Sequence, residues 1–184
     1  MIASARPFWV FGYGSLMWNP GFATPETRGA RLHGWHRAFC IYSEHYRGTP
    51  RRPGLILGLL PGGSCRGLAH RLPAKDYDAV RRYLIHREID NDGVYRETIR
   101  PIHLDDGRAV PALVYLADRD HRQFAGKLPP KRARMLILRA SGSTGSNLAY
   151  VQNTLKHLAQ LGLRDSALEV LASADPRRRR TARG

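Results

Sequence analysis

Cysteine is scarce in this chain, and long hydrophobic runs are missing. The two cysteines, Cys40 and Cys65, form no closely spaced pair, which argues against a disulfide framework and against a Cys-x-x-Cys motif. No run approaches the ~18 consecutive apolar residues of a membrane-spanning helix. The N-terminus has Arg6 and then only a short apolar segment, which is unlike a signal peptide. We therefore expect a cytoplasmic protein with reduced thiols and no membrane partner.

Acidic residues are also few, 15 against 30 lysines and arginines, so the formal net charge is +15. Part of the excess lies in residues 175–184, where Arg177 to Arg180 follow one another, but the rest of the chain is basic too. A basic surface favours anionic ligands and attracts nucleic acid without sequence specificity. We expect residues 1–174 to form a single domain and 175–184 to be a disordered Arg-rich tail, with non-specific nucleic-acid contact as its possible use.

Motifs for metal binding and nucleophilic catalysis are absent as well. Eight histidines are present, but there is no His-Glu-x-x-His, and His33 and His36 are expected on opposite faces of a strand. A nucleophile elbow around Ser15 needs glycines where Tyr13 and Met17 stand, and a dinucleotide fingerprint also fails at Met17. We expect no metal and no cofactor. Cys–His catalysis is left open, although nothing in the sequence singles out either thiol.

The most informative stretch that is present runs from Trp9 to Trp18 and reads WVFGYGSLMW. Its bulky apolar start predicts a buried strand over residues 7–13. Gly12 and Gly14 then allow backbone angles that other residues resist. Successive N–H groups after such a strand can point at one spot and bind a carboxylate or a developing oxyanion. The alternative is an ordinary strand followed by a tight turn.

The rest of the chain predicts short strands with turns between them, and three helices. Strands are expected over 31–43, 55–60, 66–72, 94–104, 109–117 and 136–138. The second and third of these are expected to form a hairpin across the turn at 61–64. Helices are expected over 74–87, from the polar loop at 141–147 to Gly162, and after Asp165. Several short strands favour a small barrel over a parallel sheet.

Glu88 stands out among the few acidic residues because it follows an apolar helix rather than lying on a polar face. Arg87 precedes it, and the turn or loop at 90–93 leaves room for a ligand. A carboxyl group in a partly apolar pocket has a raised pKa and can move a proton in either direction. The alternative is a solvated charge at a helix end.

Taken in order, these stretches resemble the ChaC-like γ-glutamylcyclotransferases, which act on glutathione. The likeness spans nearly the whole chain, whereas the loop at 90–93 and the Arg-rich tail are individual to it. The matching stretches are residues 10–16, Tyr46 to Pro50, Pro53 to Leu55, 57–59, 62–65, Gly67, Arg87 with Glu88, 142–147, Tyr150 and 161–165.

The resemblance implies an α+β fold, a small mixed or antiparallel β-barrel with flanking helices. It implies that the enzyme cleaves glutathione to 5-oxoproline and cysteinylglycine, with Glu88 as the acid/base. The substrate-binding residues that it implies are Val10, Phe11, Gly12, Tyr13, Gly14, Ser15, Leu16, Arg47 and Tyr150. A cyclotransferase for other γ-glutamyl peptides or amines is the nearest alternative. A basic nucleic-acid-binding module is an alternative of a different class, although the chain has no motif for reading nucleic acid.

Overall fold

The computed structural model describes residues 8–90 and 93–172. These residues form two compact units. The first unit holds residues 8–42 and 56–127, and the second holds 43–55 and 128–172. The expected single domain over 1–174 stays a prediction, and the Arg-rich tail at 175–184 lies outside the described residues.

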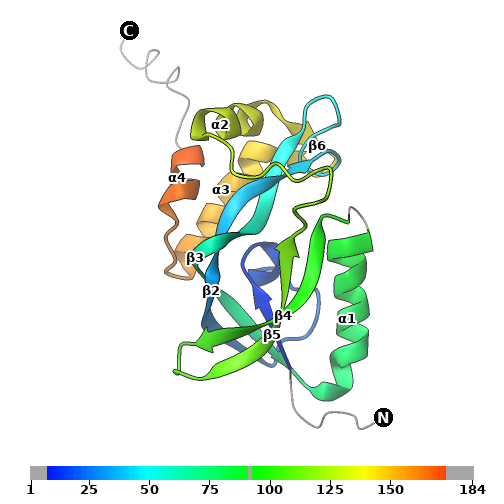
Figure 1. Cartoon of the computed structure of the whole chain (residues 1–184), viewed down its shortest axis with the longest axis vertical. Coiled ribbons are helices and arrows are strands. Elements are labelled where there is room, and N and C mark those ends of the chain that lie inside the picture. Colours follow the sequence, from blue (N-terminus) through cyan, green and yellow to red (C-terminus); the bar gives the residue numbers. More distant parts are fainter. Residues whose placement is uncertain (1–7, 91–92, 173–184) are drawn as a thin grey trace. The chain divides into compact units, whose positions relative to one another are not determined.

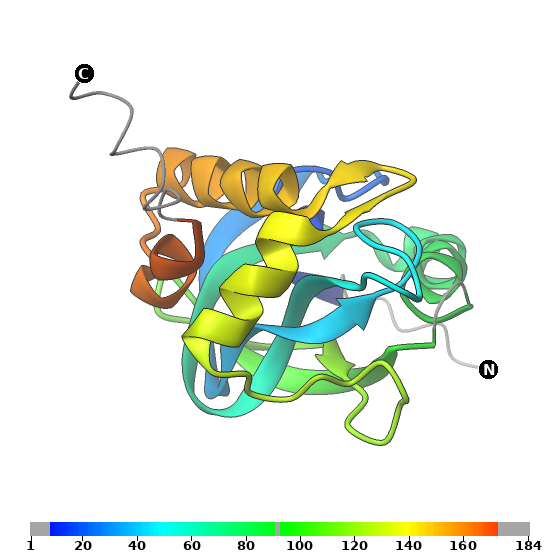
Figure 2. The same cartoon turned by 90° about the horizontal axis from the view of Figure 1, so that it is seen from above.

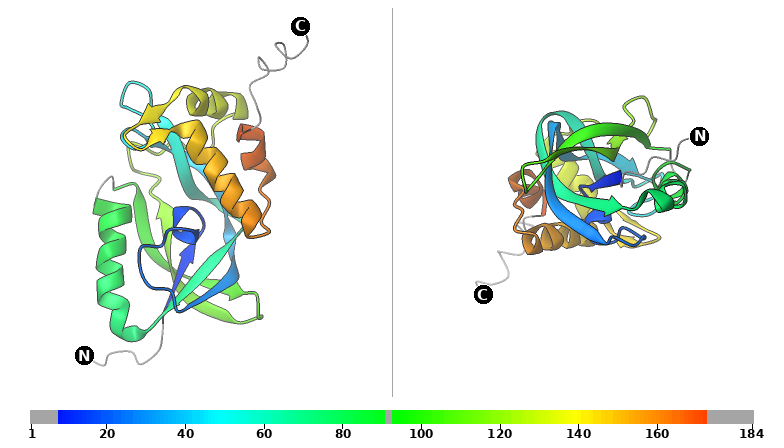
Figure 3. Two further views of the ribbon diagram at one scale, coloured as in Figure 1. Left: turned by 180° about the vertical axis from the view of Figure 1, so that it is seen from behind. Right: turned by 90° about the horizontal axis from the view of Figure 1, so that it is seen from below.

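Five strands close into a barrel (Figure 1). They are β1 (Phe8–Gly12), β2 (Glu26–Ser43), β3 (Gly54–Leu72), β4 (Tyr95–Leu104) and β5 (Ala109–Ala117), in the spatial order β1-β3-β2-β4-β5. Strand β1 pairs antiparallel with β3 and parallel with β5, so the barrel is mixed; the right-hand view in Figure 3 looks at it from below. The predicted mixed β-barrel is therefore confirmed.

Helix α1 (Tyr77–Ile85) belongs to the same unit as the barrel, and a 3-10 turn at Ala74–Asp76 leads into it. Val80 and Leu84, four residues apart, are buried on one face of the helix, as the helical spacing over 74–87 predicts. They join a core of apolar side chains from the strands and the loop after β1, made of Val10, Leu16, Leu72, Leu113 and Tyr115. The core thus fixes the helix against the end of β1.

The hairpin expected across residues 61–64 is wrong, because β3 runs through this stretch as one strand. Gly62 and Gly63 have positive φ angles of 98° and 68°, which bend the strand without reversing it. Strand β2 is the neighbour of β3 in the barrel, and two of its side chains bond to β3 at the bend and just after it. His36 Nδ1 lies 3.0 Å from the Gly62 carbonyl oxygen, and Arg37 Nη2 donates to the carbonyl of Arg66 at 2.6 Å.

The second unit is mainly helical (Figure 2). It contains α2 (Pro130–Arg139), the short strands β6 (Ser141–Gly142) and β7 (Gly145–Ser146), α3 (Asn147–Gln160) and α4 (Ser166–Ala172). The three helices contact one another. The β6–β7 ribbon leads directly into α3, so the polar loop expected at 141–147 is a two-stranded turn.

The strand expected over 136–138 is also wrong, because these residues lie in α2. Pro130 stands at the start of this helix, where its fixed φ suits a first helical position. The apolar run has a helical period, since Ala133 and Ile137 are both buried and lie four residues apart. A short apolar run cannot by itself distinguish a strand from a buried helix turn.

The helix-end signals predicted for the last two helices are confirmed. The Ser146 hydroxyl accepts a hydrogen bond from the Ala149 N–H at 3.1 Å and caps α3, which ends at Gln160, shortly before Gly162. The Asp165 carboxylate accepts from the Leu168 N–H at 3.3 Å at the start of α4. Among the described residues, none of the helices has both the length and the apolar character needed to cross a membrane.

Candidate active site

The loop that leaves β1 is a 3-10 turn at Ser15–Met17. The hydrogen bonds of this turn begin at the Met17 N–H, which donates to the Gly14 carbonyl at 2.9 Å, so the N–H groups of Ser15 and Leu16 are not used inside the turn. Such groups can bind an anion through backbone dipoles alone. The strand and turn predicted here are both confirmed.

The carbonyl oxygens of the same loop are held by groups of the protein. Arg37 donates to the Tyr13 carbonyl at 2.5 Å, and His70 Nε2 lies 3.0 Å from the Leu16 carbonyl oxygen. The Ser15 carbonyl accepts from the Asn19 N–H at 2.8 Å. Because the carbonyls are bonded in this way, the loop presents donors rather than acceptors to a ligand. Sequence reasoning missed Arg37 and His70, which lie on strands distant along the chain.

Neither Gly12 nor Gly14 has a positive φ angle, and Gly14 has φ −134° and ψ −130°. A Cβ atom at position 12 would lie 3.1 Å from both Leu16 C and Met17 N, so Gly12 is needed for close approach of the turn. At Gly14 the nearest atom to such a Cβ would be Leu57 Cδ1 at 3.5 Å, which is ordinary contact. The two glycines therefore differ in how much they constrain the loop.

The other predicted residues of this stretch are mostly core residues. Val10 and Phe11 are fully buried, and Leu16 packs in the same core cluster as Val10. Tyr13 is buried too, and its hydroxyl donates to the Tyr115 carbonyl at 2.9 Å. These side chains anchor the loop in the core.

Glu88 lies in a π-helical turn, His86–Asp90, that continues α1. Such turns are rare in proteins as a whole, and those that occur are frequently found at functional sites. The side chain of Glu88 is 15% exposed, and burial raises the pKa of its carboxyl group, although the neighbouring Arg87 opposes that rise. The solvated surface charge that we considered as an alternative does not describe this carboxyl group.

Arg87 connects the carboxylate to the loop. Its Nε lies 3.0 Å from Glu88 Oε1, and its Nη2 donates to the Ser15 hydroxyl at 2.9 Å. Its Nη1 donates to the carbonyls of Asn19 and Pro20 at 2.7 and 3.2 Å. One guanidinium thus brings together two parts of the predicted site that lie far apart in the sequence. The sequence pointed to Arg87 only as the neighbour of Glu88.

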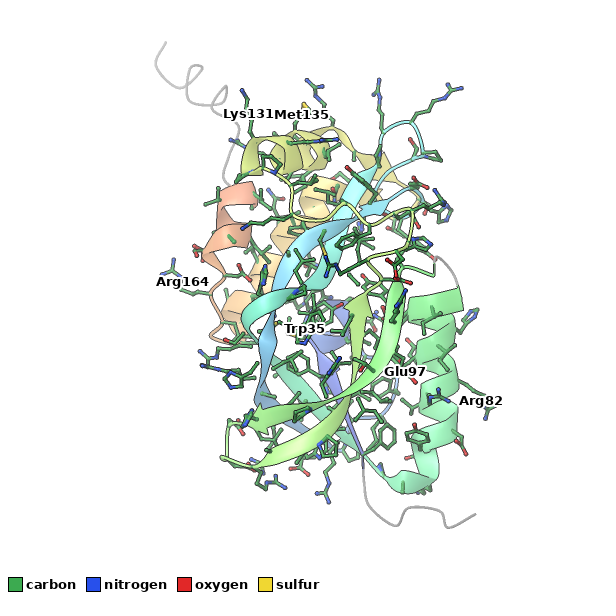
Figure 4. All side chains as sticks on the ribbon, in the orientation of Figure 1. Trp35, Arg82, Glu97, Lys131, Met135 and Arg164 are labelled. Carbon is green, nitrogen blue, oxygen red and sulfur yellow. The ribbon has the colours of Figure 1, made fainter. Side chains whose placement is uncertain are left out.

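A second buried carboxylate, Glu97, lies on β4 and is labelled in Figure 4. It is 15% exposed, like Glu88, but both of its oxygens are bonded: Arg81 Nε lies 2.8 Å from Oε1, and the Tyr115 hydroxyl donates to Oε2 at 2.9 Å. Burial and then Glu97 raise the pKa of Tyr115. Among the described residues, the Glu88 carboxylate is bonded by Arg87 at Oε1, whereas Glu97 is bonded at both oxygens.

Arg47 and Tyr150 lie in the second unit. The Arg47 guanidinium carbon is 5.1 Å from the centroid of the Tyr150 ring, and Arg47 Nη1 donates to the Thr144 carbonyl at 2.7 Å. The structure therefore brings these two predicted residues to each other. Their part in one site with Glu88 stays a prediction.

The described residues contain no group of three or more His, Cys, Asp or Glu side chains placed to hold a metal ion. Cys40 and Cys65 are both buried, and neither forms a disulfide. Burial raises the pKa of the Cys40 thiol to about 12, so this thiol stays protonated at neutral pH and is a poor nucleophile.

Comparison with solved structures defines the fold class. A glutathione-specific γ-glutamyl cyclotransferase from yeast has the same fold, with a TM-score of 0.80 over 91% of this chain and 96% of that one, at 24% identity. A family model described as "ChaC-like protein" matches residues 8–175. The chain belongs to the ChaC-like protein family.

Two curated relatives match most of the chain. A glutathione-specific γ-glutamylcyclotransferase of Escherichia coli K12 is 39% identical over 165 residues, which are 90% of this chain and 71% of that protein. A glutathione-specific γ-glutamylcyclotransferase of Schizosaccharomyces pombe is 31% identical over 83% of each chain. The resemblance that the motifs indicated is confirmed by these matches.

Proposed function

We propose that this protein is a γ-glutamylcyclotransferase that converts glutathione to 5-oxoproline and cysteinylglycine. One observation carries the proposal: a buried carboxylate, Glu88, shares a guanidinium with a loop whose carbonyls face the protein. The names of the E. coli and S. pombe relatives support the same substrate. The anionic substrate also suits a chain with a net charge of +15.

The reaction needs no nucleophile from the protein, because the substrate carries its own. The α-amine of the γ-glutamyl group attacks the γ-carbonyl and closes a five-membered lactam, and the C–N bond to cysteinylglycine breaks. The protein must fold the glutamyl chain so that amine and carbonyl meet, which removes entropy from the barrier. The α-nitrogen loses two protons as it changes from an ammonium to the lactam N–H, and the leaving nitrogen gains one to depart as an amine and a second as it becomes an ammonium. The protein must assist these transfers and stabilise the oxyanion between the two steps.

The proton transfers belong to Glu88 in this proposal. Burial raises the pKa of Glu88, so that its carboxylate can accept a proton from the α-ammonium and then donate it to the leaving amine, while the second proton lost by the α-nitrogen is exchanged with water. The N–H groups of Ser15 and Leu16 bind either the α-carboxylate or the oxyanion. Arg47 and Tyr150 bind the rest of the substrate, as the family resemblance implies. Burial of Glu97 with two bonded partners makes it a structural carboxylate.

The first test is direct. Purified protein with reduced glutathione should release cysteinylglycine and 5-oxoproline, measured by chromatography. Glu88→Gln should lower kcat by ~10²–10⁴, the usual contribution of one acid/base group, while thermal stability and glutathione binding stay near wild type. Asp78→Asn is the matched control, since Asp78 is an exposed carboxylate on the same helix. A Glu88→Gln enzyme with half the wild-type rate would show that another group moves the proton.

The alternative within the same chemistry is a cyclotransferase for other γ-glutamyl peptides or amines. Release of 5-oxoproline from glutathione should exceed release from γ-glutamyl-alanine when kcat/KM values are compared. Equal values would assign the protein to the broader substrate class. We also propose that the protein works in the cytoplasm, where its two buried cysteines stay reduced.

A further inference from the structure

The side chain of Arg87 makes more contacts than an ion pair with its neighbour requires. Its three nitrogen atoms reach Glu88, the Ser15 hydroxyl, the Tyr83 hydroxyl and the carbonyls of Asn19 and Pro20, at 2.7 to 3.2 Å. Tyr83 is one turn earlier on α1, so the guanidinium is held from its own helix as well as from the loop. The side chain is 20% exposed.

The geometry points to Arg87 as the positioning residue of this site: its guanidinium sets the place of the Ser15–Met17 turn relative to the Glu88 carboxylate. A planar guanidinium presents five N–H donors in a fixed fork, which an ammonium cannot reproduce. Asn19 and Pro20 follow the turn, so bonds to Ser15 and to these two carbonyls hold it from both ends. This inference rests on the proposed function, because it concerns how that site is assembled.

Two separable effects follow from this arrangement. The fork aligns the turn with Glu88, which affects how the γ-glutamyl group binds. The positive charge beside Glu88 favours the ionised carboxylate, and the pKa of Glu88 is lower with Arg87 present than without it. Lysine keeps the charge and loses the fork, whereas glutamine loses both. The two substitutions therefore separate alignment from charge.

Among the described residues, the charged or titratable groups that interact with Glu88 are Arg87 of its own turn and Tyr115 of β5, while Tyr83 bonds to Arg87. Burial and the neighbouring carboxylates raise the pKa of Tyr115, so this hydroxyl stays neutral over the pH range of the test. The Tyr115 hydroxyl bonds to Glu97 of β4, which is paired in turn with Arg81 of α1. A shift of the acid limb of the rate profile would therefore report on Glu88 and Arg87.

The test compares Arg87→Lys, Arg87→Gln and Ser15→Ala in glutathione cleavage from pH 5 to 9. Arg87→Gln should raise KM by about tenfold or more and move the acid limb of kcat/KM to higher pH. Arg87→Lys should raise KM similarly and leave the acid limb near its wild-type position. Ser15→Ala should raise KM slightly without a shift in pH. Arg82→Gln is the control, since Arg82 is exposed on the same helix and points away from the barrel (Figure 4).

A readout independent of activity separates this inference from the proposed function. The Glu88 carboxyl can be titrated by ¹³C NMR in wild type, Arg87→Lys and Arg87→Gln, and only the last should titrate at higher pH. An inactive wild-type protein that shows this shift would reject the proposed function and keep the Arg87–Glu88 coupling. An active Arg87→Gln enzyme with unchanged KM and pH profile would reject the positioning role. If Arg87→Gln does not fold, the positioning role is tested by comparing the KM of Arg87→Lys with that of Arg82→Gln, and equal values would reject it.

Discussion

Glycine 12 shows how one missing atom shapes the candidate site. The turn passes so close to this residue that a Cβ atom would lie 3.1 Å from the backbone of Leu16 and Met17. That separation is shorter than ordinary van der Waals contact, and the neighbour is backbone, which moves less easily than the end of a side chain. The position of the turn therefore depends directly on the absence of a side chain here.

Gly12→Ala should accordingly damage the site more than Gly14→Ala does. The first variant is expected to lose about 1–3 kcal/mol of unfolding free energy from overpacking, and to show a raised KM because the turn shifts. Gly14→Ala, with Leu57 Cδ1 at 3.5 Å, should fold with near wild-type stability. Urea unfolding and steady-state kinetics of both variants measure this. Equal behaviour of the two variants would contradict the close-approach argument.

Buried His70 gives the loop a second dependence on a single residue. The Leu16 carbonyl can only accept, so Nε2 of His70 carries the proton, and Nδ1 accepts from the Thr27 hydroxyl at 3.1 Å. Burial lowers the pKa of His70. The unfolded chain therefore binds the proton more readily than the folded one, so this residue's contribution to stability is present above about pH 6.5 and is lost as pH falls.

Urea unfolding of wild type and His70→Gln between pH 5 and 8 tests this sign. Wild type should lose stability below about pH 6.5, and the glutamine variant should lose less over the same range because it does not titrate. Glu88 acts in the opposite direction, since its raised pKa favours the folded state as pH falls. The comparison is therefore between the two proteins, with exposed His33→Gln as control. Parallel pH profiles would mean that His70 does not cause the acid sensitivity.

Among the elements, β3 departs most from what its sequence suggests. The Pro-Gly-Gly-Ser stretch reads as a turn, yet the strand continues through it because Gly62 and Gly63 bend the backbone by taking positive φ angles. The space around both glycines is open, apart from His36 Cβ at 3.7 Å from a Cβ placed at Gly63. The requirement for glycine here is therefore conformational rather than steric.

Gly62→Ala should lower the unfolding free energy by about 1–2 kcal/mol, the cost of placing an L-residue in the left-handed region. Ser64→Ala is the matched control, because Ser64 is exposed at the same bend and has no positive φ. Chemical denaturation of the two variants gives the difference. A Gly62→Ala protein as stable as Ser64→Ala would mean that the bend does not need this backbone conformation.

At the scale of the whole molecule, the question is which parts of the chain carry the net charge of +15. The second unit contains a groove of about 550 Å³ that is lined by Arg51, Arg52 and Arg139 together with apolar residues, among them Met135. Among the described residues, none of these three arginines pairs with a carboxylate. Positive charge is thus present on the folded part of the chain as well as in residues 175–184.

Deleting residues 175–184 should leave glutathione cleavage unchanged and remove most of any binding to DNA. Fluorescence anisotropy with a short duplex, at salt concentrations from 50 to 200 mM, measures the salt slope of binding. The slope should fall by up to about 0.9 for each arginine contact that is lost. Full binding by the truncated protein would instead mean that DNA contacts the folded part of the chain. The double variant Arg51→Gln with Arg139→Gln would then test the groove. Specific, salt-resistant binding would support the nucleic-acid-binding alternative.

The sequence was sufficient to predict those elements whose structure depends only on residues close together in the chain. The periodic spacing of Val80 and Leu84 determined α1, and Ser146 and Asp165 marked the starts of α3 and α4. The apolar run before Gly12 determined β1, and an acidic residue after an apolar helix singled out Glu88. Each of these depends on neighbours within about one turn of chain, which the sequence shows directly.

The tertiary structure alone decided the features that depend on contacts between distant residues. The run at 136–138 is helical because it packs as a helix in the second unit, and β3 stays one strand because it lies between β1 and β2 in the barrel. Arg87 meets Ser15 across 72 positions of sequence, which no local pattern encodes. A sequence shows which groups exist, whereas burial and bonding between remote segments determine the pKa of Glu88 and the groups that hold the loop opposite it.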